Sequence, residues 1–160
     1  MSIKNIKASF ILEDKVGTSG IFKENNVVYT IYPHVKSLVN VTGIKSFQHL
    51  ELAKKIVESK FKQKVLNVRI DNTFFSKKNY ENVDMAKVYK FMQNNPLFHV
   101  DYNIELFAGM YLKPKTGDYP TILFFRTGSY TMMGAKKKDI LMECQIFVNN
   151  LILMFNQRCI

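Results

Sequence analysis

Two short motifs occur twice in the chain, in the same order, and this internal repeat restricts the fold more than any other feature. Ile3-Lys4-Asn5 matches Ile70-Asp71-Asn72 at an offset of 67 residues, from position 5 to position 72. Thr42-Gly43-Ile44-Lys45 matches Met133-Gly134-Ala135-Lys136 at an offset of 91 residues, from position 45 to position 136. The difference of 24 residues between the offsets indicates an insertion in the second half. The pattern predicts two similar units that bury apolar surface together.

The first half is predicted to be three strands and one helix. Alternation and β-branched residues favour strands over Ile3–Glu13, Asn26–Tyr32 and Ser37–Thr42, the last two forming a hairpin. Ser46 is placed to cap a helix that presents Phe47, Leu50 and Val57 on one face and runs to Phe61. A further strand is expected over Val65–Phe75.

The second half adds one helix to this order. Asn82 is expected to cap a helix through Met92, which the first half lacks. Strands are expected over Glu105–Leu112, Pro120–Phe125 and Tyr130–Met133, with a turn at 127–129 and a long helix over Asp139–Phe155. Since strand side chains alternate, Ile122 and Phe124 should face the helices, and Leu123 and Phe125 should face away.

These elements predict the α+β class. We expect a single domain over residues 1–160, with one repeat over about 1–66 and the other over about 67–160. Side-by-side joining of the repeats gives one antiparallel sheet with both long helices on one face.

Charge favours a polyanionic partner. The chain carries 23 Lys and Arg against 13 Asp and Glu, a formal net charge of +10, and its 47% hydrophobic content excludes a disordered chain. The two cysteines, Cys144 and Cys159, and the three scattered histidines show no metal spacing. No catalytic constellation or phosphate loop is evident, so we expect no enzyme, no cofactor and no metal. The longest apolar run, near Ile146–Phe155, is interrupted by Asn149 and Asn150 and is too short for a membrane span.

The second half contains motifs that resemble a known family. The motifs are Glu105-Leu106-Phe107-Ala108-Gly109-Met110, then Ile122–Gly128 and Gly134-Ala135-Lys136. They are similar to the strand start, Phe-ending strand and Gly-Ala-Lys helix entry of the TATA-binding protein (TBP) family. The resemblance implies a pseudo-symmetric saddle whose concave sheet face lies in the minor groove of double-stranded DNA, with Phe wedges at both ends. It also implies a nuclear transcription initiation factor that recruits a transcription factor IIB-like partner and RNA polymerase; in a viral setting, a cytoplasmic factory would serve equally.

The resemblance carries over residue by residue. Asn5 and Asn72 match the central Asn pair that hydrogen-bonds base acceptors, and such amides favour A·T over G·C. Phe107 and Phe125 match one wedge pair, Tyr32 the second wedge of the first repeat, Leu123 a floor contact and Thr42 the Thr beside the central bases. Glu105 and Leu106 match the edge offered to transcription factor IIB. The predicted DNA contacts are Asn5, Tyr32, Thr42, Asn72, Phe107, Leu123, Phe125, Met133 and Lys136.

Several positions depart from the family pattern. Met133 replaces a Thr, Lys7 and Phe74 replace small apolar residues, and Asn103 replaces an acidic residue. The first-repeat Phe-Pro-Gly falls near Thr18-Ser19-Gly20 without a Phe, and without a longer turn its second wedge falls on His34 rather than Tyr32.

Other interpretations remain open. Phe107 and Phe125 could be core aromatics, Asn5 and Asn72 strand-edge or turn residues, and Lys136-Lys137-Lys138 a solvated run rather than a phosphate contact. The missing first-repeat Phe, Met133 and Phe74 favour an alternative function, a protein-interaction module of the same fold that has lost independent DNA bending. An unrelated basic enzyme or RNA-binding domain would require the repeat to be coincidence.

Overall fold

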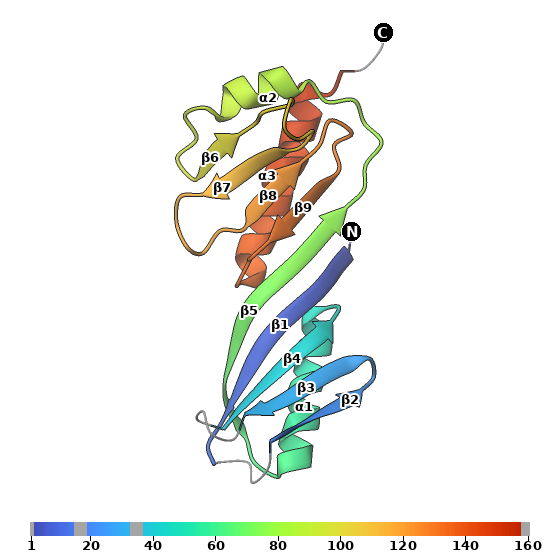
Figure 1. Cartoon of the computed structure of the whole chain (residues 1–160), viewed down its shortest axis with the longest axis vertical. Helices are drawn as coiled ribbons and strands as arrows, with labels where there is room; N and C mark the ends of the chain where they lie inside the picture. The colour runs from blue at the N-terminus through green and yellow to red at the C-terminus, as the bar shows by residue number, and fades with distance from the viewer. Residues whose placement is uncertain (1, 15–18, 33–36, 158–160) are drawn as a thin grey trace. The chain divides into compact units, whose positions relative to one another are not determined.

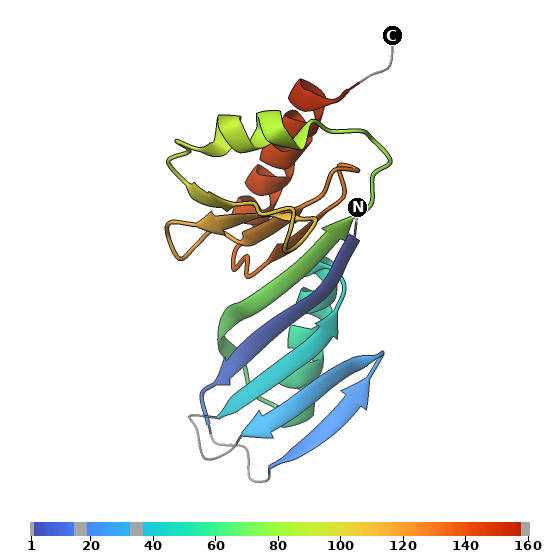
Figure 2. The same cartoon turned by 45° about the horizontal axis from the view of Figure 1, so that its top comes forward.

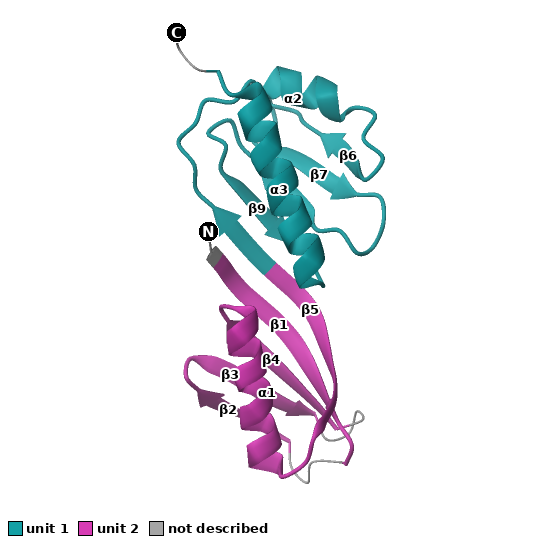
Figure 3. Cartoon of the chain, turned by 180° about the vertical axis from the view of Figure 1, so that it is seen from behind, with its two compact units in different colours: residues 1–2, 74–160 teal, residues 3–73 magenta. Residues whose placement is uncertain are grey.

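The computed structural model describes residues 2–14, 19–32 and 37–157. The chain divides into two compact units (Figure 3). Residues 3–73 form the N-terminal unit, and residues 74–160 with the first two residues form the C-terminal unit. Each unit pairs strands with one long helix, as the internal repeat predicts, so the expected α+β class is confirmed.

The N-terminal unit contains four strands, one helix and most of a fifth strand. The strands are β1 (Ser2–Leu12), β2 (Gly20–Glu24), β3 (Val27–Tyr32), β4 (Leu38–Ile44) and β5 (Val65–Lys77), and the helix is α1 (Phe47–Phe61). Their order in the sheet is β2-β3-β4-β1-β5 (Figure 1), and the β3–β4 hairpin is confirmed.

Alternation along β1 separates the core of the N-terminal unit from its opposite sheet face. Ile6, Ala8, Phe10 and Leu12 are buried, and they join Leu50, Ala53 and Val57 of α1 in one apolar core. Helix α1 lies across this face of the sheet (Figure 3). The alternate positions of β1 therefore face away from the helix.

The C-terminal unit repeats this plan and adds a helix and a strand. It contains α2 (Met85–Met92), β6 (Phe98–Asp101), β7 (Met110–Pro114), β8 (Thr121–Phe124), β9 (Tyr130–Met133) and α3 (Lys138–Phe155). The strand order is β5-β9-β8-β7-β6. Helix α3 covers one face (Figure 3), and α2 lies beside the C-terminal end of α3, where the Phe91 and Phe155 rings are 5.5 Å apart (Figure 2).

A glycine with positive φ precedes the long helix of each unit. Gly43 has φ +97° at the end of β4, and Gly134 has φ +90° just after β9. A Cβ on Gly43 would lie 2.7 Å from the backbone oxygen of Asn26, so a side chain is excluded there. The matched motifs therefore serve the same strand-to-helix turn. Helix α2 and strand β6 have no counterpart in the described part of the N-terminal unit, and they lie where the offsets place the insertion.

Several local expectations are confirmed and others are wrong. Ser46 caps α1, since its Oγ accepts from the His49 backbone N–H at 3.0 Å, and Gly128 forms the expected turn at φ +78°. The cap of α2 is Asp84 and not Asn82, because the Asp84 carboxylate accepts from the Lys87 N–H at 3.2 Å.

The expected strand over Glu105–Leu112 begins only at Met110. Asn103 causes the difference, because its backbone oxygen accepts from the N–H groups of Leu106 and Phe107, both at 3.0 Å, and closes a turn. Strands β2 and β6 were not expected. None of the helices described in residues 2–14, 19–32 and 37–157 is long and apolar enough to cross a membrane.

Candidate nucleic-acid interface

Each unit has a sheet face opposite its helix, which we call its open face. In the N-terminal unit this face is mostly polar. β1 contributes Asn5, Lys7 and Ser9, and β4 contributes Asn40 and Thr42, all alternating with buried positions. Such a face offers hydrogen-bond donors and acceptors rather than apolar contact area.

Asn5 and Thr42 lie together on this face. The Asn5 Oδ1 atom accepts from the Gly43 backbone N–H at 2.7 Å, which fixes which end of the amide is the nitrogen. The Nδ2 atom donates to Thr42 Oγ1 at 3.2 Å with one of its two hydrogens. The amide is therefore held in place by its own unit, with a second N–H hydrogen available to a ligand.

A charged cluster that sequence analysis missed lies on the same face. The Arg69 Nε atom is 2.7 Å from Asp71 Oδ1, and the fully buried Ser9 donates to Asp71 Oδ2 at 2.5 Å. Arg69 Nη2 also donates to Ser9 Oγ at 3.3 Å, and Ser9 Oγ lies 2.8 Å from Asn40 Oδ1. Asp71 stands where the motif Ile70-Asp71-Asn72 differs from Ile3-Lys4-Asn5, so the internal repeat carried no signal for it. The negative charge of this carboxylate repels a phosphate-rich ligand unless Arg69 neutralises that charge.

A shallow hollow of about 190 Å³ adjoins this cluster. Lys7, Thr30, Tyr32, Thr42 and Asp71 are among its lining residues. Tyr32 is 43% exposed at the end of β3, so its ring is accessible. His34, the alternative wedge position, and Thr18 lie outside the described residues.

The open face of the C-terminal unit is apolar and ends in the predicted wedge pair. The Phe107 and Phe125 rings meet edge to face with centres 6.0 Å apart, and Phe107 is 44% exposed. Both rings lie over Gly109, together with Leu123: a Cβ built on Gly109 would be 2.7 Å from Phe107 Cε1, 2.8 Å from Leu123 Cδ1 and 3.0 Å from Phe125 Cε1. Ile122 and Phe124 are fully buried on the helix side, which confirms the expected alternation along β8.

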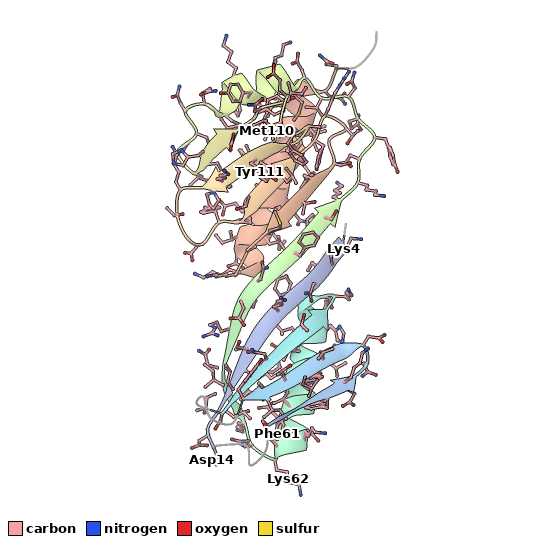
Figure 4. The ribbon with its side chains drawn as sticks, in the orientation of Figure 1. Lys4, Asp14, Phe61, Lys62, Met110 and Tyr111 are labelled. Carbon is pink, nitrogen blue, oxygen red and sulfur yellow. The ribbon has the colours of Figure 1, made fainter. Side chains whose placement is uncertain are left out.

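Tyr111 extends this apolar surface across β7 (Figure 4). Its ring stacks on Phe107 at 5.8 Å, and Lys113 Nζ lies 5.7 Å from the ring centre. Met110, the neighbour of Tyr111, is fully buried, so the two side chains face opposite sides of the sheet. Sequence analysis did not identify Tyr111, although its alternation with Met110 and Leu112 was visible.

Two of the departures from the family pattern are cross-strand partners. Phe74 on β5 pairs with Met133 on β9, and Met133 pairs in turn with Thr121 on β8. Phe74 is 37% exposed and Met133 half-buried. A bulky apolar pair therefore lies on the open face of the C-terminal unit, where β9 ends and β8 begins.

Asn72 differs from its repeat counterpart Asn5. Its side chain is half-buried, and its Oδ1 atom is shielded from solvent with no hydrogen-bond partner among the residues that the structure describes. The Asn5 amide, by contrast, is anchored by Gly43 and Thr42. The two matched amides thus have different surroundings.

The remaining predicted residues lie on exposed segments. Lys136 is exposed between Gly134 and α3, whose cap residue Lys137 makes no side-chain cap bond. Glu105 and Leu106 lie in the turn closed by Asn103, and Leu106 is 83% exposed. In the described part of the chain, no group of three or more His, Cys, Asp or Glu residues could hold a metal ion.

Comparison with known proteins supports the fold. No family model matches the sequence, and no curated protein matches it. The structure is similar to that of the TBP of Methanococcus jannaschii, with a TM-score of 0.61 and 19% identity over 93% of this chain and 95% of that chain. At this level of identity the likeness concerns the fold, and it shows that the chain has a divergent TBP-like fold.

Proposed function

We propose that the chain is a DNA-binding transcription initiation factor that binds A·T-rich double-stranded DNA in the minor groove and bends it. The observation that carries this proposal is the Phe107–Phe125 pair over Gly109, at the edge of an uncovered apolar sheet face. Minor-groove proteins insert such apolar side chains between base steps and kink the duplex. The net charge of +10 supplies attraction to the phosphates.

The two units would contribute differently. In the C-terminal unit, Phe107 and Phe125 would open a base step, with Leu123 and Tyr111 in contact with the groove floor. In the N-terminal unit, the anchored Asn5 amide would donate its second hydrogen to adenine N3 or thymine O2. Thr42, Tyr32 and Asn72 would contribute further contacts there, and Lys136 would contact a phosphate.

The proposed role is binding and recruitment rather than catalysis. Glu105 and Leu106 protrude on an exposed turn and are proposed to contact a transcription factor IIB-like partner, which would bring RNA polymerase. The proposed place of action is at the DNA template, in the nucleus. No cofactor is part of this proposal.

A second candidate is a protein-interaction module of the same fold without independent DNA bending. The Arg69–Asp71 pair favours it, because it places a carboxylate on the open face of the N-terminal unit. The Phe74–Met133 pair favours it too, because two bulky side chains occupy a row that a groove floor would have to accommodate.

End-labelled FRET combined with gel shift separates the two candidates. An A·T-rich TATA duplex and a G·C-rich duplex are compared at two salt concentrations, with wild type, Phe107→Ala and Phe125→Ala. Phe91→Ala is the matched control, because Phe91 is 49% exposed but lies on α2, away from the open face. A tight, salt-sensitive, bent complex that only the two wedge variants lose supports the DNA-binding proposal. Weak, unbent and sequence-indifferent binding would contradict it and favour the interaction module.

A further inference from the structure

A hollow of about 320 Å³ lies in the C-terminal unit beside Phe125. Its walls come from the end of β5, the segment that follows it and the β8–β9 turn. The polar residues that matter here are Lys77, Lys78, Thr127, Ser129 and Thr131, and Phe125 forms part of the wall. The predicted site included Phe125 but none of these polar residues.

Hydrogen bonds hold the walls of the hollow together. The Asn79 backbone N–H donates to Ser129 Oγ at 3.0 Å, and Ser129 Oγ donates to the Asn79 backbone oxygen at 3.1 Å. The Asn79 Nδ2 atom donates to the Gly128 backbone oxygen at 2.8 Å. Three hydrogen bonds thus join the loop after β5 to the β8–β9 turn, and they hold the two walls of the hollow in place.

The charge of the hollow is positive. Two lysines line it, and none of its lining residues is acidic. Lys77 is half-buried and Lys78 exposed, and neither has an ion-pair partner in the part of the chain that the structure describes. The hydroxyls of Thr127 and Thr131 add neutral donors. Ammonium and hydroxyl groups around one hollow are typical of a site for an oxyanion such as phosphate.

The position of the hollow indicates which phosphate it would take. A base step opened by Phe125 is joined to its own backbone phosphates through a single sugar, so these phosphates must pass close to the wedge. The hollow shares Phe125 with the wedge pair. A backbone phosphate of the opened step is therefore the nearest available anion.

We propose that Lys77 and Lys78, with the hydroxyls of Thr127 and Thr131, bind a DNA backbone phosphate next to the base step that Phe125 opens. This inference rests on the proposed DNA-binding function and adds a positioning role to it. This phosphate contact fixes the position of the DNA strand along the protein, so that Phe125 meets a base step rather than a sugar.

The salt dependence of duplex binding tests the site. The full chain, Lys77→Ala/Lys78→Ala and the control Lys87→Ala/Lys90→Ala are titrated with the A·T-rich duplex at several salt concentrations. Both double variants remove two positive charges, but Lys87 and Lys90 lie on α2 outside the hollow. We expect the hollow variant alone to lower the slope of log affinity against log salt, by about 0.9 for each phosphate that the protein no longer neutralises.

Single methylphosphonate substitutions along the duplex then locate the contact. We expect wild type to lose affinity at one or two adjacent phosphates and the hollow variant to lose nothing further there, because the interacting charge is already gone. Equal slope changes in both double variants, or additive losses at every phosphate, would overturn the inference while the proposed function stands. Absence of salt-dependent duplex binding by wild type would overturn both.

Discussion

The rings of Phe107 and Phe125 meet edge to face, 6.0 Å between centres, across the space that a side chain on Gly109 would fill. The two phenylalanines reach this position from different segments, one from the turn before β7 and the other from the end of β8. Their contact therefore depends on how closely the backbone at Gly109 approaches both rings.

Gly109→Ala should disturb the wedge pair without unfolding the chain. The new Cβ would lie 2.7 Å from Phe107 Cε1 and 3.0 Å from Phe125 Cε1, which forces both ring tips to shift. Since ring tips can move, we expect a decrease of about 1 kcal/mol in unfolding free energy and a clear decrease in FRET-detected bending. Gly117→Ala is the control, because a Cβ there has no atom within 4 Å. Unchanged bending in Gly109→Ala would mean that the ring arrangement is not what bends the duplex.

Lys137→Asp should stabilise the fold and weaken DNA binding at the same time. Lys137 is the cap residue of α3, has extended dihedrals of −133° and 140°, and makes no side-chain cap bond. An Asp there can accept from the backbone N–H groups of the first turn and replaces a cation that the helix dipole disfavours, worth about 1 kcal/mol. Urea unfolding and duplex titration measure the two effects.

Ser46→Ala provides the reference for this comparison, because it removes an existing cap bond from α1 and should cost about 1 kcal/mol. If Lys137→Asp stabilises the chain but leaves duplex affinity and its salt slope unchanged, the lysine run before α3 is a solvated surface rather than a phosphate contact.

Alkaline pH should destabilise the C-terminal unit. Burial raises the pKa of the Cys144 thiol from 9.0 to about 12, and that of the Tyr130 hydroxyl from 10.0 to about 12. The folded state keeps these protons while the unfolded state releases them, so their stabilising contribution is complete below about pH 9 and is lost as the pH rises toward 12. The loss is roughly 1.4 kcal/mol per pH unit for each group while only the unfolded state has released its proton.

Urea unfolding of wild type and Cys144→Ala between pH 8 and pH 11, a range chosen to cross the onset at about pH 9, checks this expectation. The stability advantage of wild type over the variant should shrink as the pH rises, because only wild type must keep the thiol protonated. A constant difference across the range would show that the Cys144 thiol does not titrate differently in the folded and unfolded states.

Helix periodicity and the internal repeat are enough to predict the long elements of the fold. Helices α1 and α3, the β3–β4 hairpin and the burial of Ile122 and Phe124 follow from local patterns. Strand β2 does not, because most of its residues are exposed on an edge strand. Its pairing with β3 and the stacking of Phe22 on Tyr29, 4.5 Å between ring centres, hold it to the sheet. Such a contact has no local signature in the sequence.

The parts of the candidate site that follow the internal repeat or the family resemblance were predictable from the sequence. Asn5 and Thr42, which both belong to repeated motifs, lie together, whereas Ser9 and Asp71 are 62 positions apart and only strand register brings them together. The turn at Asn103 resembles a strand in sequence, since Leu106 and Phe107 are apolar although both are exposed. Strand prediction assumes that apolar residues are buried, so apolar residues that are exposed on a turn are wrongly predicted as a strand.

Asp71→Asn should lower stability and raise DNA affinity. The carboxylate accepts from the fully buried Ser9 at 2.5 Å and pairs with Arg69 at 2.7 Å. Removal of the charged acceptor should cost about 1–2 kcal/mol. At the same time the open face of the N-terminal unit becomes less negative and Arg69 becomes available to a phosphate, which should steepen the salt dependence of duplex binding.

Two matched variants separate these effects. Asp101→Asn also breaks a salt bridge, to Lys113 at 3.1 Å, but both partners are more than half exposed, so the unfolding free energy should change by less than about 1 kcal/mol. Glu51→Gln removes one negative charge from the exposed surface of α1 and controls for net charge. If Asp71→Asn and Glu51→Gln raise duplex affinity equally, the gain reflects overall charge and the N-terminal unit's open face does not contact DNA. A gain in duplex affinity confined to Asp71→Asn would place the duplex against this face. It would also mean that the Arg69–Asp71 pair stabilises the fold but weakens DNA binding.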